Sequence, residues 1–330
     1  MAPLPAPLPA SLPAPPLPLA VPGAAMVQLR GTPLSGGRLE GGTTQPLERA
    51  SGGDTPVLSF RTALGPVRLL LDTGASSSLI TPALAARLRL PATALDSSRF
   101  ELAGGGEGCA ALKPLRTRLP VLEMGDAASG RLQLVGLEAL VLPVAALPPG
   151  VEGVLGAPSL RQLPIRIEPA ANRLALGPPA LLPPLPAGPT PQRLPLRWQR
   201  GVPLLRLQPQ DGGASVEALA DTGAEGVFLS PALAARLEPR GPAEALRLVG
   251  FCGEQRVVRQ PFSGLALVGA RPGRGPIEGI LTVNPIFRQL GVEAIVGQEL
   301  LRDVTQLWRL DLTPPRLELT DRHSARRSAR

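Results

Sequence analysis

The chain has 330 residues, of which 44% are hydrophobic and only 2% aromatic, with no Tyr. This length favours two compact units with cores of Leu, Val, Ile and Ala. The net charge of +8 raises the possibility of a nucleic-acid partner. The Arg residues are scattered, however, and few aromatic side chains are available to stack on bases. We therefore interpret the charge as a solvated basic surface and expect no nucleic acid.

Composition also excludes several kinds of catalytic site. The single histidine, His323, lies in a basic tail that we place at residues 321–330. A Ser-His-Asp or Cys-His mechanism needs a positioned imidazole, which the body of the chain lacks. Cys109 and Cys252 are too few for a disulfide framework or a Cys/His zinc site, so we expect no metal and no other cofactor.

Residues 1–53 are rich in Pro and Gly, and the first charged residue is Arg30. A secretory signal begins with a basic region, and a membrane-spanning helix needs a long unbroken apolar run. We interpret the segment as a disordered leader and expect no transmembrane segment. A signal truncated at its start is the alternative, which would place the protein in the periplasm or outside the cell; the sequence as given slightly favours the cytoplasm.

The first lobe is predicted over residues 54–177. Apolar runs at 56–60 and 67–71 around Gly65 indicate a hairpin. The tetrapeptide Asp72-Thr73-Gly74-Ala75 follows, and then a short helix over 82–88, for which Thr81 is the N-cap and Pro82 the first residue.

Further along, this lobe contains a strand that runs into glycines at 100–106 and an apolar strand that ends in Gly at 154–156. An alternating hairpin over 165–176 closes it. The segment 178–199 is dense in Pro and is predicted to be a semi-rigid linker.

The second lobe, predicted over residues 200–320, repeats this order. Its expected elements are strands at 203–207 and 216–220, the tetrapeptide Asp221-Thr222-Gly223-Ala224, a helix at 231–237 capped by Ser230, a strand into glycines at 246–253, an apolar strand at 295–297, and a hairpin from 310–312 to 317–319.

The two halves are an internal repeat. Residues 72–90 and 221–239 are identical at 11 of 19 positions, at a constant spacing of 149 residues. One Asp-Thr-Gly alone is also typical of a tight turn. Its recurrence after an apolar strand, at the same point of a repeat, indicates instead a paired site made of Asp72 and Asp221.

Such a pair has defined chemistry. Two carboxylates a few ångströms apart cannot both ionise, so they share one proton. The ionised member can activate a water, and the protonated member can polarise a carbonyl. Gly74 and Gly223 would let the backbone turn tightly against the carboxylates, and Thr73 and Thr222 would hydrogen-bond across the lobe interface.

Around Leu70–Ser76 and Leu219–Ala224 the chain resembles the aspartic peptidases, and the retropepsin-like branch in particular, with two lobes fused in tandem as in pepsin-type enzymes. The resemblance implies an all-β, bilobal acid-protease fold with a pseudo-twofold axis and few short helices. It implies a monomeric endopeptidase, with a polypeptide substrate extended in the inter-lobe cleft. Flap residues would then be Gly104, Gly105, Gly106, Gly250 and Gly253.

Some residues depart from the family pattern. Pro158 and Glu299 stand where family lobes usually have Asp or Asn, and Glu225 would place an extra carboxylate near the dyad. Cys109 and Cys252 fall in the expected flap regions, where thiols are favoured over an inter-lobe disulfide. The alternative function is a peptide-binding module with a pepsin-like cleft and no turnover.

Overall fold

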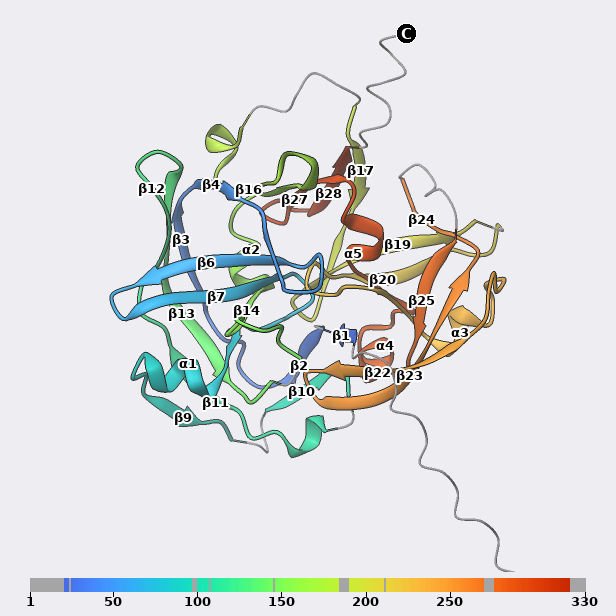
Figure 1. Ribbon diagram of the computed structural model, residues 1–330, viewed down its shortest axis with the longest axis horizontal. Helices are drawn as coiled ribbons and strands as arrows, with labels where there is room; N and C mark the ends of the chain where they lie inside the picture. Colours follow the sequence, from blue (N-terminus) through green and yellow to red (C-terminus); the bar gives the residue numbers. More distant parts are fainter. Residues whose placement is uncertain are drawn as a thin grey trace, which may run out of the picture.

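The computed structural model describes residues 21–23, 25–96, 100–106, 108–144, 146–183, 190–210, 212–269 and 276–320. It shows two β-rich lobes side by side, the first in blue and green and the second in yellow and orange, with a third sheet shared between them (Figure 1). The predicted all-β, two-lobe class is confirmed. Within the described ranges, none of the helices has the length and apolar character needed to cross a membrane.

The first lobe is built on a ten-stranded sheet. Its main path runs β12 (Leu122–Asp126), β6 (Pro56–Thr62), β7 (Gly65–Asp72), β14 (Gly153–Gly156), β8 (Leu79–Ile80), β13 (Gly130–Val141), β11 (Leu115–Arg118) and β9 (Ala92–Ala94), with β3 (Gly36–Gly41) beside β13 and β5 (Glu48–Arg49) beside β6.

The second lobe has its own ten-stranded sheet. Its path runs β1 (Val21–Gly23), β22 (Glu244–Gly250), β23 (Gly253–Phe262), β25 (Ile277–Leu281), β21 (Val227–Leu229), β26 (Ala294–Val296), β20 (Val216–Ala220), β19 (Val202–Pro209) and β18 (Arg197–Gln199), with β24 (Leu265–Leu267) beside β19.

The same three-strand unit lies at the centre of both sheets, as the repeat predicts. In the first lobe β7 pairs in parallel with β14, which pairs antiparallel with β8. In the second lobe β20, β26 and β21 make the equivalent pairings. These strands are almost wholly buried, which explains why they are continuous apolar runs rather than alternating ones.

A six-stranded sheet takes strands from both halves of the chain. Its order is β17 (Gln192–Pro195), β28 (Arg316–Thr320), β27 (Thr305–Arg309), β15 (Ile165–Glu168), β16 (Arg173–Leu176) and β4 (Thr43–Pro46). The lobes meet where β15 pairs with β27, which sets Ile165 opposite the fully buried Trp308.

Helices are few and short. Thr81 and Ser230 cap α1 (Pro82–Arg87) and α3 (Pro231–Ala234) by accepting hydrogen bonds from Leu84 and Leu233, as predicted, although α3 ends earlier than expected. The others are α2 (Ala157–Leu160), α4 (Pro285–Leu290), α5 (Gln298–Leu301) and the 3₁₀ turns η1 (Cys109–Ala111), η2 (Pro169–Ala171) and η3 (Pro179–Leu181).

The predicted disordered leader is wrong from residue 21 to residue 53. This segment contains β1, β2 (Met26–Arg30) and β3 to β5, and it adds a strand to each of the three large sheets. Leu39 and Leu47 are buried in the core. A Gly-rich backbone still carries its N–H and C=O groups, so it pairs with edge strands despite a weak side-chain pattern. Residues 1–20 lie outside the described residues.

Two further boundaries differ from expectation. The predicted linker at 178–199 contains β17 and β18, which belong to sheets. The last hairpin begins at β27 rather than at residues 310–312, because the buried positions of that strand are Gln306 and Trp308. The predicted basic tail at 321–330 falls outside the described residues.

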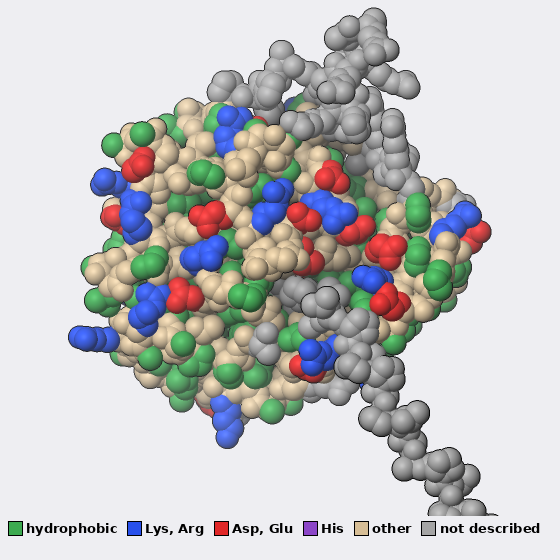
Figure 2. Space-filling model, viewed as in Figure 1, with side chains coloured by type: hydrophobic (Ala, Val, Ile, Leu, Met, Phe, Trp, Pro, Cys, Tyr) green, Lys and Arg blue, Asp and Glu red, His purple; other side chains and the backbone are tan. Residues whose placement is uncertain are grey.

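Figure 2 shows one face of the molecule, on which Lys and Arg side chains are interspersed with Asp and Glu. Ion pairs between exposed or half-buried side chains occur in the structure, for example between Arg87 and Glu152 and between Arg236 and Glu293. Such pairs contribute little to stability, but they neutralise basic charge locally. The sequence led us to expect a solvated basic surface; on this face the basic side chains are mixed with acidic ones.

Candidate active site

Asp72 and Asp221 stand at equivalent positions of the two lobes. Asp72 is the last residue of β7, and Asp221 directly follows β20. Both side chains are fully buried, and each carboxyl group lies against the motif glycine of the opposite lobe. The predicted pair is therefore brought together at the lobe interface.

The motif glycines allow this approach. A methyl group added to Gly74 would lie 2.4 Å from Cγ of Asp221, and one added to Gly223 would lie 2.5 Å from Cγ of Asp72. Both distances are far below van der Waals contact, so each glycine is the residue that admits the carboxyl group of the opposite lobe.

The motif threonines hold the two loops in register. The hydroxyl of Thr73 accepts a hydrogen bond from the Thr222 N–H, and the hydroxyl of Thr222 accepts one from the Thr73 N–H, both at 3.0 Å. Each hydroxyl also donates to a backbone carbonyl of the opposite lobe, on Ala220 or Leu71, at 2.7 Å. Both threonines are fully buried, so all four bonds are shielded from water.

Burial raises both acid pKa values, and for Asp72 the neighbouring negative charge adds to this effect. For Asp72, burial is the main cause and the neighbouring Asp221 charge the second, and together they hold its pKa well above 3.8. Burial also raises the pKa of Asp221, to about 6, against hydrogen bonds that favour its ionised form. Because the charge of Asp221 raises the pKa of Asp72, Asp221 ionises first and the monoanion keeps its proton on Asp72.

The remaining hydrogen bonds of the pair are few. Gly223 N–H donates to Oδ1 of Asp221 at 2.8 Å. Among the described residues, no N–H or hydroxyl group donates to either oxygen of Asp72 or to Oδ2 of Asp221. Because both carboxyl groups are buried together, they cannot both ionise and must share one proton.

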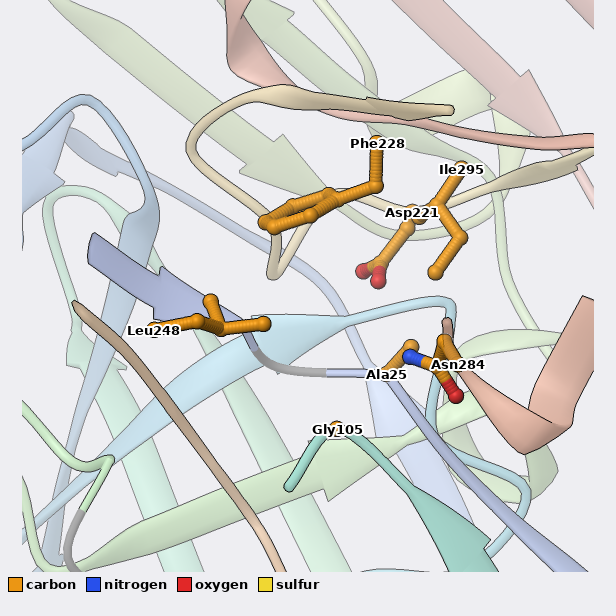
Figure 3. A pocket seen from close by; sticks show the side chains of 8 residues that line it. Ala25, Gly105, Asp221, Phe228, Leu248, Asn284 and Ile295 are labelled. Atoms are coloured by element: carbon orange, nitrogen blue, oxygen red, sulfur yellow. The ribbon is translucent and has the colours of Figure 1, made fainter. Parts of the chain in front are cut away.

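A small cavity of about 10 Å³ adjoins Asp221, close to the space that one water needs. The carboxylate of Asp221 points into it, with Ala25 and Gly105 on the opposite side (Figure 3). Ala224, Phe228, Leu248, Asn284 and Ile295 complete the lining. The sequence did not single out Ala25 or Asn284, since neither lies in the repeated motif.

Strand β2 crosses directly beside the first motif. The Met26 N–H donates to the Gly74 carbonyl at 3.2 Å, and the Ser76 N–H donates to the Met26 carbonyl at 2.9 Å. The Gln28 N–H donates to Oγ of Ser76 at 2.6 Å. On its other edge β2 pairs antiparallel with β10 (Glu101–Gly104). An extended segment of the chain thus fits between the motif loop and β10 through main-chain contacts.

The predicted flap glycines come together from the two lobes. Gly104, Gly105 and Gly106 follow or end β10, and Gly250 and Gly253 flank the turn of the β22–β23 hairpin. A methyl group on Gly250 would lie 2.2 Å from the Gly105 carbonyl oxygen, so the backbones of the two loops pack directly against each other.

Cys109 and Cys252 form a disulfide, with Cα atoms 4.5 Å apart and 143 residues between them in sequence. The prediction of unpaired thiols is therefore wrong. Each cysteine lies beside the flap glycines of its own lobe, and the pseudo-symmetric closure of the lobes brings these positions together. The placement of both cysteines beside the flap glycines is the feature of the sequence that could have predicted this disulfide.

Glu225 is not directed to the dyad by its contacts. Its carboxylate accepts hydrogen bonds from the backbone N–H groups of Asp54, at 2.8 Å, and Thr55, at 3.0 Å. It thus fastens the second motif loop to the start of the first lobe. The prediction that Glu225 places an extra carboxylate near the dyad is therefore wrong, because the backbone N–H groups of Asp54 and Thr55 bind this carboxylate instead.

Pro158 and Glu299, which the sequence analysis singled out as departures from the family pattern, have different surroundings. Pro158 lies in α2, where it lines a groove at the lobe surface. Glu299 lies in α5, and partial burial raises its pKa. Its neighbour Gln298 is buried and donates through Nε2 to the Thr222 carbonyl at 2.8 Å. Gln298 therefore supports the second motif, a role that the repeat did not indicate.

Residues 63–158 match the family described as aspartyl protease. The matched segment includes the first Asp-Thr-Gly motif. No curated protein matches it in sequence.

Two basic 7S globulins are among the solved structures that resemble the chain. Basic 7S globulin from soybean has a TM-score of 0.47 at 11% identity, over 87% of this chain and 95% of that one. Conglutin gamma, a basic 7S globulin from lupine seeds, has a TM-score of 0.47 at 12% identity, over 89% and 97%.

Proposed function

We propose that the protein is an aspartic endopeptidase, in which Asp72 and Asp221 together activate a water for hydrolysis of a peptide bond. The observation that carries the proposal is the pair of fully buried aspartates, each at the end of an equivalent strand and each with its carboxyl group against the motif glycine of the opposite lobe. The aspartyl protease domain over residues 63–158 supports the same reaction class.

The order in which the two carboxyl groups lose their protons determines which aspartate acts as the base and which as the acid. In the monoanion, ionised Asp221 takes a proton from the water, whose oxygen attacks the carbonyl carbon. Protonated Asp72 donates to the carbonyl oxygen, which gives a tetrahedral diol. The proton on Asp221 then passes to the amide nitrogen as the C–N bond breaks, and Asp72 recovers its proton when the carboxyl product forms. Two carboxyl groups thus supply the acid and the base, and the proposed reaction uses no cofactor.

An extended polypeptide is the substrate class that the site favours. The chain's own β2 satisfies the Gly74 carbonyl and the Ser76 N–H with the N–H and C=O of one residue, Met26. These hydrogen bonds recognise the main chain of the bound segment rather than its side chains, as in binding by strand addition. A substrate strand in place of β2 would meet the same donors and acceptors.

A peptide-binding module without turnover is the second candidate. It is favoured by one observation, that β2 already lies between the motif loop and β10. A binder, however, gains nothing from two buried acids whose confinement raises both pKa values.

Cleavage of an unfolded protein by the purified chain tests the proposal. The chain should be assayed between pH 4 and 8, with and without a thiol reductant, and the products identified by mass spectrometry. We expect wild-type cleavage that Asp72→Asn and Asp221→Asn both lack. Absence of cleavage under all of these conditions, from protein that is folded, would favour the binding module.

A further inference from the structure

The disulfide joins a loop of the first lobe to a loop of the second, next to the glycines that pack together beside the site. Around it, the Cys252 N–H donates to the Gly105 carbonyl at 2.8 Å, and the Gly108 N–H donates to the Cys252 carbonyl at 2.5 Å. Gly104 also packs against Sγ of Cys252. The loop after β10 and the turn of the β22–β23 hairpin, which we call the two clasp loops, are therefore joined covalently.

The N-terminal segment runs beneath this junction. Val21–Gly23 pairs in parallel with β22 of the second lobe, and Met26–Arg30 pairs antiparallel with β10 of the first. The Ala25 carbonyl oxygen lies near Gly104, and Ala25 faces Asp221 across the small cavity (Figure 3). The segment thus occupies the position where a polypeptide must lie to reach the dyad.

We propose that the Cys109–Cys252 disulfide is a redox latch. When it is oxidised, the clasp loops are held together over residues 25–30, and other polypeptides are excluded from the dyad. When it is reduced, the loops separate, the strand exchanges with solvent, and substrate enters. The consequence for turnover rests on the proposed function, but the opening itself does not.

The chemistry balances with a dithiol as reductant. Cys109 is half-buried, whereas Cys252 is 3% exposed, so a reductant thiolate meets Sγ of Cys109 first. Its attack breaks the S–S bond and releases Cys252 as a thiolate. The second thiol of the reductant then displaces Cys109, and the reductant leaves as a disulfide. Two electrons and two protons reach the protein, which ends with two thiols.

Reduction should loosen the clasp because it removes the covalent link and leaves only main-chain hydrogen bonds and the packing of Phe251 and Cys252 in the cluster that contains Met26. Two neutral main-chain hydrogen bonds cross the junction between the described parts of the loops, and the loops are rich in glycine, which gains backbone entropy when released. By contrast, the lobes stay joined through the β15–β27 pairing. Opening is therefore confined to the clasp loops and the strand beneath them.

Hydrogen exchange in the full-length Asp221→Asn variant tests the latch without any turnover. Oxidised protein should protect the amides of Met26, Gln28 and Cys252, and reduction by dithiothreitol should speed their exchange at least tenfold. Amides of the β27–β28 hairpin should not change, which serves as the internal control for folding. Equal protection of Met26 before and after complete reduction would overturn the latch.

The double variant Cys109→Ser, Cys252→Ser is the matched control, and should exchange rapidly whether or not dithiothreitol is present. If it fails to fold, wild-type protein that is reduced and then alkylated replaces it, with fluorescence of the buried Trp308 as the test of folding. A fast-exchanging strand with no cleavage would refute the proposed function and support the latch. Cleavage at equal rates in both redox states would refute the latch alone.

Discussion

Thr73 and Thr222 exchange hydrogen bonds with each other's backbone at the same distance, 3.0 Å, and so close a symmetric link between the lobes. The link places both motif loops with a single set of contacts. Any movement of one loop must therefore be followed by the other or must break buried hydrogen bonds, which are costly to leave unmade.

Replacement of either threonine by Val should destabilise the fold and disturb the dyad. Thr222→Val removes the acceptor of the Thr73 N–H and the donor to the Leu71 carbonyl, which leaves two buried polar groups unpaired. We expect a loss of about 1–3 kcal/mol per unpaired group in urea unfolding. Thr222→Ser keeps the hydroxyl and is the control. Equal stability of the Val and Ser variants would contradict the link.

The activity should have its acidic limb near neutrality. The monoanion forms only above the pKa of Asp221, about 6, and disappears above the still higher pKa of Asp72. We therefore expect a bell-shaped profile of kcat/KM in reduced protein, falling below about pH 6. Peptide hydrolysis measured across the range is the test. A maximum at pH 3 to 4 would show that the pair titrates with ordinary carboxyl pKa values.

Asp221→Asn should stabilise the protein at alkaline pH. The folded pKa of about 6 lies above the ordinary 3.8, so the native state holds this proton more tightly than the unfolded chain. The wild type is then most stable below about pH 4 and loses stability as the pH rises through 6. The difference of two pKa units corresponds to about 3 kcal/mol. We expect the variant to exceed wild type in Tm at pH 8 and to match it near pH 4.

Asp72→Asn and Asp221→Asn should each remove nearly all turnover, by a factor on the order of 10⁴. The two carboxyl groups form one acid–base pair, so the double variant should be hardly worse than either single variant. Single-turnover assays on one peptide substrate provide the comparison. If the losses multiply, the aspartates act separately.

Truncation separates the part of the N-terminus that belongs to the fold from the part that precedes it. Deletion of residues 1–20 leaves every described strand intact and should leave Tm nearly unchanged. Deletion of residues 1–53 removes β1 to β5 with the buried Leu39 and Leu47, and should prevent folding or lower Tm steeply. Circular dichroism melts of both proteins are the measurement. A stable 54–330 protein would restore the shorter domain boundary.

Features encoded in local patterns could be predicted from the sequence. The hairpins before each motif, the caps Thr81 and Ser230, and the pairing of Asp72 with Asp221 all follow from a repeat that is visible in the residues. The central strands of both sheets could be predicted because they are apolar runs bounded by Gly.

Contacts that depend on main-chain pairing, or on how the two lobes close on each other, could not be predicted from the sequence. Strands β3 and β4 pair through backbone groups, and their Gly- and Thr-rich sequences lack an alternating apolar pattern. The Cys109–Cys252 bond and the Glu225 contact to Thr55 join residues 143 and 170 positions apart. Such contacts follow from how the lobes close on each other, which no local pattern encodes.

The shared sheet also limits how this protein could be divided. If the chain were split within the 184–189 stretch, β15 would lose β27 as its neighbour and β27 would lose β15. Each fragment would present a bare strand edge, with apolar residues such as Ile165 and Trp308 newly exposed beside it. Unpaired edges of this kind recruit other strands and aggregate. The two fragments should therefore be insoluble when made separately and soluble when made together, because each is the other's missing neighbour.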